Sequence, residues 1–346
     1  MRQLPLTQGI HAWVRDEYVT RVKQCKIRRG LLYDAIIDDL KALRDALKNG
    51  SVTKNGRVMS SYLQQRHVDY IQLIIDRLPE LLYAKPSEFL SKHIPDFEKL
   101  VSRQIVNDKI RINGDTPESL SDRLVRIMRY MTVRKKIAPE FFRKLEVKSC
   151  VYCNANYAIT DAQNEAYFDM DHWKPKALYP YLSISFFNFQ PSCASCNRRK
   201  NDSDEPFFSL WNEQMGANMD VLDFKLSDYS LIKYIVFGDK KDLNVTLEPA
   251  HPHDPQNVKL RDVAEQKFHL EARYKEHDDV VEEIVWKKWI YNQSYVLSLR
   301  RALGYEIPSF VDVRRFILGT YADAEDIHKR PLTRMIQAVA KKVGVM

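Results

Sequence analysis

The sequence predicts a mainly helical protein that carries a small α+β insert near its middle. Apolar residues recur every three or four positions in much of the first 145 residues and again beyond residue 257, which is typical of helices that bury one face. Between these parts, residues 148–208 lose the helical spacing and are rich in aromatic, Asn, Cys and Pro residues. We therefore expect a helical, basic N-terminal region (1–145), a central domain (146–215) and a mostly helical C-terminal region (216–346).

Length and composition exclude several classes of protein. A chain of 346 residues exceeds what one hydrophobic core usually serves, so two or three domains are expected. Hydrophobic residues at 45%, charged residues at 29% and only 10 glycines exclude a disordered or collagen-like chain. Residues 1–15 lack the apolar stretch of a secretion signal, and no run of about 18 apolar residues occurs. We expect a cytoplasmic protein with no membrane partner.

The formal net charge of +8 is concentrated in the N-terminal region. Residues 1–145 hold 28 Lys and Arg against 17 Asp and Glu, whereas residues 146–215 hold 6 against 9 and the remainder is balanced. Arg123, Arg126 and Arg129 step by three along an expected helix. A solvated helix face is the simpler explanation of this run, and a stripe of phosphate contacts is the alternative.

Apolar residues at helical spacing mark the N-terminal helices. Three segments are expected to be helical: residues 32–47, 68–82 and 120–131. Asn49 and Gly50 supply a stop signal after the first segment, and Thr116 and Pro117 supply a start signal before the third. Each of these helices would pack its apolar face on the others.

The same spacing returns in the C-terminal region. Residues 263–299 are rich in helix formers, and residues 311–343 contain two more apolar stretches that Pro331 divides. Trp286 and Trp289 stand at helical spacing, so we expect both indole rings in a core.

Four cysteines of the central segment predict a zinc site. Cys150 and Cys153 form one Cys-x-x-Cys pair, and Cys193 and Cys196 form a second. This spacing lets both sulfurs of a pair face one ion, and four thiolates complete the tetrahedral shell of zinc without leaving an open position. The ion would therefore be structural. The remaining Cys25 fits a reduced thiol in a helical region.

The segment between the two pairs carries oxygen and nitrogen donors. Alternation predicts a strand over residues 167–171, which places Asp169 and Asp171 on one face and His172 at its end. A second strand or extended loop through residues 185–190 would carry Asn188. We expect a short helix from about Cys196 to present the next residue, Asn197, on its first turn.

Those residue types suit metal-assisted hydrolysis of a phosphodiester. The side-chain oxygens of Asp171 and Asn197 are hard ligands that bind Mg²⁺ or Mn²⁺ and leave positions for water and phosphate. His172 is suited to deprotonate the attacking water, and Asn188 would hold the loop through hydrogen bonds. Asp169 is expected to be solvated or hydrogen-bonded, with a secondary ligand role as the alternative.

This pattern of cysteines, Asp171-His172, Asn188 and Asn197-x-x-Lys200 resembles the HNH endonuclease family with its ββα-metal core. The resemblance covers about a sixth of the chain. It implies that His172 is the general base, that Asp171 and Asn197 bind the catalytic metal, and that Asn188 supports the loop. It also implies cleavage of DNA that leaves 5′-phosphate ends. The sequence departs from many members at Asn197, where they have His, which gives an H-N-N variant.

The stretch from His172 to Pro180, with the following motif residues, looks similar to the HNH effectors of bacterial anti-phage systems, such as PtuB of Septu. That resemblance implies an ATPase partner of the ABC/SMC type, which would be another chain because this sequence has no phosphate-binding loop motif. Four basic residues are candidates to hold flanking phosphates: Lys174, Lys176, Arg198 and Lys200.

Two alternatives to an active endonuclease stay open on the sequence alone. One is a zinc-stabilised module that binds nucleic acid with a decayed active site. The other is an interaction subunit of an ATPase complex whose nuclease is silent until the complex is activated.

Overall fold

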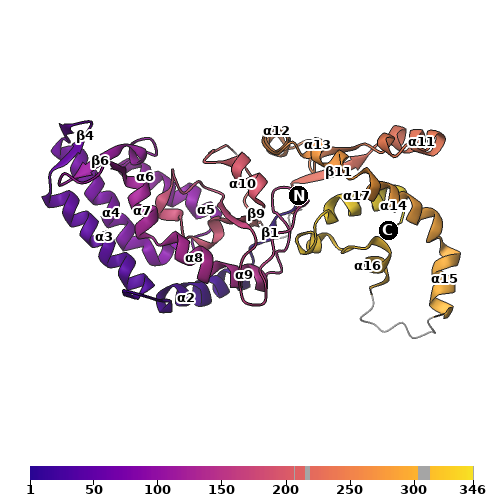
Figure 1. Ribbon diagram of the computed structural model, residues 1–346, viewed down its shortest axis with the longest axis horizontal. Helices are drawn as coiled ribbons and strands as arrows, with labels where there is room; N and C mark the ends of the chain where they lie inside the picture. Colours follow the sequence, from indigo (N-terminus) through magenta and orange to yellow (C-terminus); the bar gives the residue numbers. More distant parts are fainter. Residues whose placement is uncertain (206, 215–218, 303–311, 346) are drawn as a thin grey trace.

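The computed structural model describes residues 1–205, 207–214, 219–302 and 312–345. The protein is mainly helical with small sheets, which confirms the predicted class. Helices of the N-terminal region gather at one end of an elongated molecule, those of the C-terminal region gather at the other, and the central segment lies between them (Figure 1). Within the described ranges, no helix is long and apolar enough to span a membrane.

The N-terminal region is built around two long amphipathic helices that pack on each other. These are α3 (Leu32–Asn49) and α4 (Ser61–Leu81), and Gly50 ends the first as predicted. The shorter elements around them are β1 (Leu4–Pro5), α1 (Gln8–Trp13), α2 (Val19–Gln24), β2 (Lys26–Ile27), β3 (Gly30–Leu31), α5 (Pro86–Glu88), α6 (Ile94–Leu100) and α9 (Ala138–Lys144).

A small antiparallel sheet caps these helices in the strand order β5-β4-β6-β7. Its strands are β4 (Val52–Lys54), β5 (Arg57–Val58), β6 (Lys109–Ile112) and β7 (Glu118–Ser119). The sequence did not predict this sheet, because strands of two to four residues leave too short an alternation to recognise.

The prediction of one helix over residues 120–131 is wrong, because the structure divides this stretch between two helices. Helix α7 covers Leu120–Ile127 and begins at Ser119, whose side-chain oxygen accepts from the Asp122 amide, so the start signal is not at Thr116-Pro117. Arg129 then adopts a left-handed conformation (φ 53°), and α8 (Tyr130–Lys136) leaves in a new direction. A left-handed residue breaks the hydrogen-bond ladder of a helix.

The central segment contains one antiparallel strand pair followed by a helix. Strand β8 (Asp169–His172) pairs with β9 (Phe189–Ser192), and α10 (Ala194–Lys200) follows β9 after Cys193. The register aligns Asp169 with Ser192 and His172 with Phe189. The predicted strand therefore exists, although it begins two residues later than expected and includes His172.

The C-terminal region combines a two-stranded antiparallel sheet with helices. Strands β11 (Leu222–Leu226) and β12 (Val245–Pro249) pair along their whole length. The helices are α11 (Asp228–Phe237), α12 (Pro255–Phe268), α13 (Leu270–Lys275), α14 (Asp278–Ile290), α15 (Gln293–Ala302), α16 (Val313–Leu318) and α17 (Thr333–Val343).

Two details of this region differ from expectation. The stretch 263–299 is divided among four helices, and His269 is left-handed (φ 49°) where α12 ends. Trp286 and Trp289 are 44% and 54% exposed, so the prediction that both lie in a core is wrong. Helical spacing identifies a common face but not whether a partner covers it. Val311, at the start of the last predicted stretch, lies outside the described residues.

Both ends of the chain contribute to the centre of the molecule. Strand β1 pairs in parallel with β10 (Trp211–Asn212), and the Met1 amine donates to the Leu222 carbonyl. The amides of Lys148 and Ser149 donate to the His328 carbonyl (2.7 and 2.9 Å). The central segment is thus held by contacts from far along the sequence, and the division into three domains stays a prediction.

Candidate functional site

The four central cysteines form one buried cluster. Cys150 and Cys153 lie in the turns after α9, Cys193 caps α10, and Cys196 lies in its first turn. Their four sulfurs lie within 4.8 Å of one another. Four sulfurs at about 2.3 Å from a central ion would be spaced in this way, so the cluster fits a tetrahedral zinc ion. A metal-binding cluster of these four cysteines is therefore supported by geometry, and zinc is the ion that suits it.

Hydrogen-bond donors surround the sulfurs. The Arg273 guanidinium on α13 donates to Cys196 Sγ (3.3 Å) and Cys153 Sγ (3.6 Å), and Asn156 Nδ2 donates to Cys193 Sγ (3.3 Å). Hydrogen bonds from Cys150 and the other thiols lower the pKa of Cys193. Burial opposes the charge of Arg273, but the sulfurs of Cys153, Cys196 and Cys193 together outweigh burial and raise the pKa of Arg273. The pKa values of Cys150 and Cys196 are raised, so within this cluster the negative charge concentrates on Cys193 and Cys153. The donors from Arg273 and Asn156 are placed as outer partners of a metal-bound cluster would be.

Strand β8 and helix α10 face each other beside this cluster. As the alternation predicts, Asp169 and Asp171 both reach α10: Asp169 Oδ2 accepts from Asn197 Nδ2 (3.0 Å), and Asp171 Oδ2 contacts Lys200 Nζ (3.2 Å). Asn197 therefore meets Asp169 rather than Asp171. The sequence could not show which carboxylate bonds to Asn197, because this pairing depends on where α10 crosses the strand.

Asp171 is buried, and one of its carboxylate oxygens has two partners. Its Oδ2 accepts from the Tyr152 hydroxyl (2.6 Å) as well as from Lys200. The Lys200 ammonium is 0% exposed and also donates to the His172 carbonyl (2.7 Å). A buried carboxylate with a buried ammonium is stable only because each compensates the other. In this conformation Lys200 neutralises Asp171 and does not reach solvent.

His172 lies on the opposite face of β8 from the two carboxylates. Its Nε2 is 2.9 Å from the Ser183 carbonyl, and its ring packs against Tyr130 (4.9 Å between centroids) and Phe189 (5.5 Å). Burial lowers the pKa of His172 to about 3, so the imidazole is neutral at physiological pH. Asp171 and His172 are therefore adjacent in sequence but on opposite faces of β8, and Asn197 contacts Asp169.

Asn188 ties together the loop that follows His172. It is fully buried immediately before β9, its Oδ1 accepts from the Lys174 amide (2.7 Å), and its Nδ2 donates to the carbonyls of Lys174 (3.0 Å) and Leu182 (3.1 Å). These hydrogen bonds join the loop after His172 to the residue that precedes β9. Their contribution to catalysis stays a prediction.

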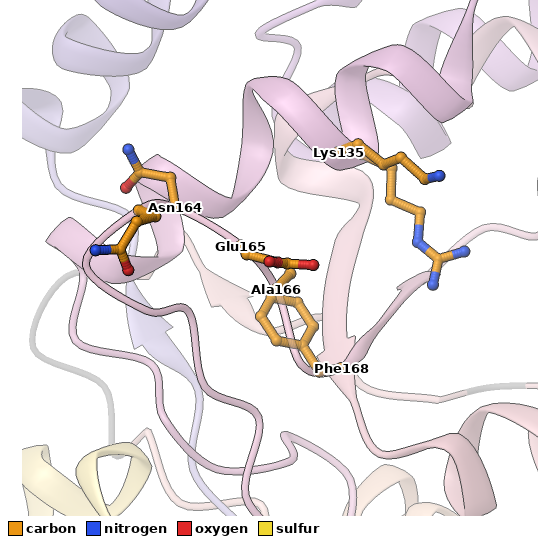
Figure 2. Close-up of a pocket in the computed structure, with 7 residues that line it drawn as sticks. Lys135, Asn164, Glu165, Ala166 and Phe168 are labelled. Carbon is orange, nitrogen blue, oxygen red and sulfur yellow. The ribbon is translucent and has the colours of Figure 1, made fainter.

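A cavity of about 460 Å³ lies between α8 and residues 163–168, which precede β8. Arg134 lines it and donates to Asp169 Oδ1 (2.9 Å), and Lys135 lines the same cavity. The side chains of Lys135 and Asn164 stand at its two sides, with Glu165 between them (Figure 2). The surface around Asp169 therefore combines exposed cations with amide and carboxylate groups.

The four candidate phosphate-binding residues have different surroundings. Arg198 is exposed on α10. Lys174 ion-pairs with Asp204 (3.3 Å) and lies over the Trp173 ring, and Lys176 lies over the Tyr130 ring. With Lys200 buried, Arg198 has the freest access to solvent of the four, and a phosphate-binding role stays a prediction for each.

The comparisons with known proteins are sparse. No protein-family model matches the chain, and no solved structure matches it. Over a short segment the chain resembles the Septu protein PtuB of Bacillus thuringiensis. The two are 34% identical over 55 residues, which is 16% of this chain and 20% of that protein. Because the similar segment spans only a fifth of that relative, it hints at a related role without showing the family.

Several contacts of this site were not predicted from the sequence. Tyr152 lies between the first two cysteines, so its place beside the cluster was readable, whereas its hydrogen bond to Asp171 was not. Arg273 lies 77 residues beyond Cys196 in the sequence, in a segment without any motif. Only the packing of α13 against the cluster reveals it.

Proposed function

We propose that the chain is a metal-dependent endonuclease of the HNH type that hydrolyses phosphodiester bonds of DNA in anti-phage defence. The observation that carries this proposal is the β8–β9 pair followed by α10 and joined to a four-cysteine cluster. This unit supplies a carboxylate strand, an imidazole and a carboxamide helix in the order of the motif. The local similarity to the Septu protein PtuB supports the assignment to defence.

The oxygen donors of β8 and α10 fit a hard divalent cation. Asp171 and Asn197 are the predicted ligands, and Asp169 joins them as a candidate because its carboxylate is the one that contacts Asn197. Bound Mg²⁺ or Mn²⁺ would neutralise charge on the reacting phosphate and stabilise the departing oxygen. Arg134 would then be free to exchange Asp169 for a phosphate oxygen.

The chain's own residues would handle the proton and hold the loop. With Nε2 of His172 donating to the Ser183 carbonyl, Nδ1 keeps the lone pair that accepts a proton from water. The three hydrogen bonds of the Asn188 side-chain amide hold the loop between His172 and the Ser183 carbonyl in place. Because His172 is 2% exposed, substrate binding must open a path to its ring.

The proposed partners are DNA and an ATPase of the ABC/SMC type. Lys135 is exposed on α8 and lines the cavity that Arg134 shares, and Arg198 is exposed on α10 next to Asn197; both cations suit a phosphate backbone. The N-terminal charge surplus could serve the same backbone. The ATPase is proposed from the local similarity to PtuB, and copurification of the two chains tests it.

The test is cleavage of plasmid and phage DNA by the purified chain with Mg²⁺ or Mn²⁺. The His172→Ala variant should lose cleavage while it keeps its fold and its zinc. His67→Ala is a matched control, since His67 is also buried but lies on α4, outside the motif. Undiminished cleavage by the His172 variant, or equal loss in both variants, would refute the assignment.

One observation favours a second candidate, a silent or decayed nuclease that binds nucleic acid or acts as an interaction subunit of an ATPase complex. Asp171 is already neutralised by Lys200, and His172 is buried on the other face of the strand. A shift of DNA mobility without cleavage, under every metal tested and with the ATPase present, would support this candidate over the first.

A further inference from the structure

The small N-terminal sheet carries a cavity of about 480 Å³ on its surface. Six residues of β4, β6 and the adjoining turns line it: Thr53, Asn55, Gly56, Lys109, Arg111 and Pro117. Among the described residues no carboxylate lines this cavity, whereas Glu165 lines the one beside α8. The sheet lies at the end of the molecule away from the C-terminal helices (Figure 1).

The register of the sheet places four polar side chains of this cavity on one face. Thr53 of β4 lies directly opposite Arg111 of β6, and the same register continued by one residue brings Asn55 beside Lys109. Lys109 and Arg111 are two positions apart, so they share a face of β6, and the residues that alternate with them are buried. Both cations therefore point away from the core and toward the cavity.

These four side chains have no partner elsewhere in the described ranges. The side chains of Thr53, Asn55, Lys109 and Arg111 make neither a hydrogen bond nor an ion pair with another described residue. Three of the four are exposed, and Thr53 is half-buried. Two cations, a hydroxyl and an amide group thus stay available to a ligand.

Carboxylates that lie near the sheet are held by other cations. The ion pairs are Asp108 with Lys54 (2.5 Å), Asp115 with Arg123 (2.7 Å) and Glu118 with Arg126 (2.6 Å). Burial disfavours the charge of Asp115, but the Arg123 hydrogen bond outweighs burial and lowers the Asp115 pKa, and the charge of Arg111 acts on Asp115 more weakly. Lys109 and Arg111 are therefore left without a carboxylate at ion-pair distance among the described residues.

This set of groups suits the oxygens of a phosphate. All four side chains can donate a hydrogen bond, and phosphate oxygens only accept. Gly56 has a positive φ (76°) in the turn between β4 and β5, and it has no side chain to obstruct the cavity. Residues 1–145 hold 28 Lys and Arg against 17 Asp and Glu. A charge surplus of this extent attracts a long polyanion more than a small anion.

We propose that this cavity binds the phosphate backbone of duplex DNA and holds the duplex outside the proposed cleavage site. Lys109 and Arg111 contact phosphates, and the hydroxyl of Thr53 and the amide of Asn55 add neutral hydrogen bonds. Contacts of this kind are independent of base sequence. The choice of DNA rests on the proposed function, whereas the site itself uses none of the motif residues of β8 and α10.

The first test measures the affinity of the zinc-bound full chain for a short fluorescent duplex without Mg²⁺ or Mn²⁺, which separates binding from cleavage. Each phosphate contact contributes about 0.9 to the slope of log affinity against log salt concentration. Lys109→Gln with Arg111→Gln should therefore reduce the slope by about 1.8 and weaken binding by roughly tenfold or more at about 0.1 M salt. Both residues are exposed and unpaired, so circular dichroism and zinc content should not change.

The matched control is Lys225→Gln with Lys241→Gln, which removes the same charge. Lys225 of β11 and Lys241, which follows α11, are exposed and have no ion pair with a described residue. This control should keep the parent slope. A parent that does not bind DNA, an unchanged slope in the Lys109 and Arg111 variant, or an equal reduction in both variants would overturn the site.

The same proteins separate this site from the proposed nuclease. Cleavage by the parent, together with an unchanged slope in the Lys109 and Arg111 variant, would refute the site and leave the nuclease standing. A reduced slope in that variant, together with no cleavage by the parent, would support the site and count against the nuclease. Binding of inorganic phosphate, ATP or anionic vesicles that depends on the two cations, with an unchanged slope for DNA, would also overturn the proposal.

The second test locates the contact without any substitution. The parent is treated with an amine-acetylating reagent, with and without saturating duplex, and mass spectrometry reports how fast each lysine reacts. The rate at Lys109 should fall several-fold when DNA is bound, while the rates at Lys225 and Lys241 should stay the same. An unchanged rate at Lys109 with the duplex bound would contradict the proposed contact.

Discussion

Replacing Arg273 should weaken zinc binding although the residue is not a ligand. The Arg273→Met variant keeps the length of the side chain and removes both hydrogen bonds to sulfur, at 3.3 and 3.6 Å. Four thiolates and Zn²⁺ carry a net charge of −2, which the guanidinium offsets at short range. Without it, the cluster has to hold the same negative charge in a largely apolar setting.

The size of the effect follows from the two contacts. A hydrogen bond to a charged group is worth about 1.5–3 kcal/mol, and the longer contact contributes less. Loss of an outer partner typically costs 10–100-fold in metal affinity. We therefore expect zinc affinity to fall about 10–100-fold, which corresponds to about 1.4–2.8 kcal/mol.

The assay is competition with a chromogenic zinc chelator on the full chain. Arg273→Lys should lie between the parent and Arg273→Met, because an ammonium keeps the charge but not the forked geometry. Arg261→Met on α12 is the matched control, since Arg261 ion-pairs with Asp262 (3.3 Å). Zinc affinity within twofold of the parent in both Arg273 variants would refute the reasoning.

Three further outcomes are expected. Cys193→Ser should release zinc and lower the melting temperature, and metal analysis that finds a full zinc complement would contradict the structural role. Lys200→Met should lower the free energy of unfolding by about 3–5 kcal/mol, because it leaves Asp171 buried without its cation. In denaturant titrations, adding Asp171→Asn to the same chain should restore part of the lost free energy of unfolding. Burial lowers the pKa of His328 to about 4, so the unfolded chain binds the extra proton between pH 6.5 and 4, and about 3 kcal/mol of stability is lost as pH falls through that window. Thermal denaturation should show a shallower decline for His328→Gln, and parallel declines would argue against it.

The sequence was most informative where chemistry is encoded locally. The spacing of Cys150, Cys153, Cys193 and Cys196 needed no long-range information, and the four sulfurs do lie together. The long amphipathic helices α3 and α4 were predicted for the same reason.

The sequence was least informative where distant segments decide the outcome. Alternation predicted that both carboxylates of β8 lie on the same face. It did not predict that Asn197 bonds to Asp169 or that Lys200 forms an ion pair with Asp171. Those pairings depend on the crossing of α10 over β8. The exposure of Trp286 and the contact of Arg273 with the sulfurs likewise depend on how the C-terminal helices pack.

The bonds from Lys148 and Ser149 to His328 have a consequence for biosynthesis. These residues are separated by about 180 positions, so the central segment cannot make its last backbone contacts until nearly the whole chain has left the ribosome. At about 5–20 residues per second, that interval is on the order of 10 s after Cys196 is made. A nascent chain would therefore spend this time with its four cysteines made but without the contacts to His328.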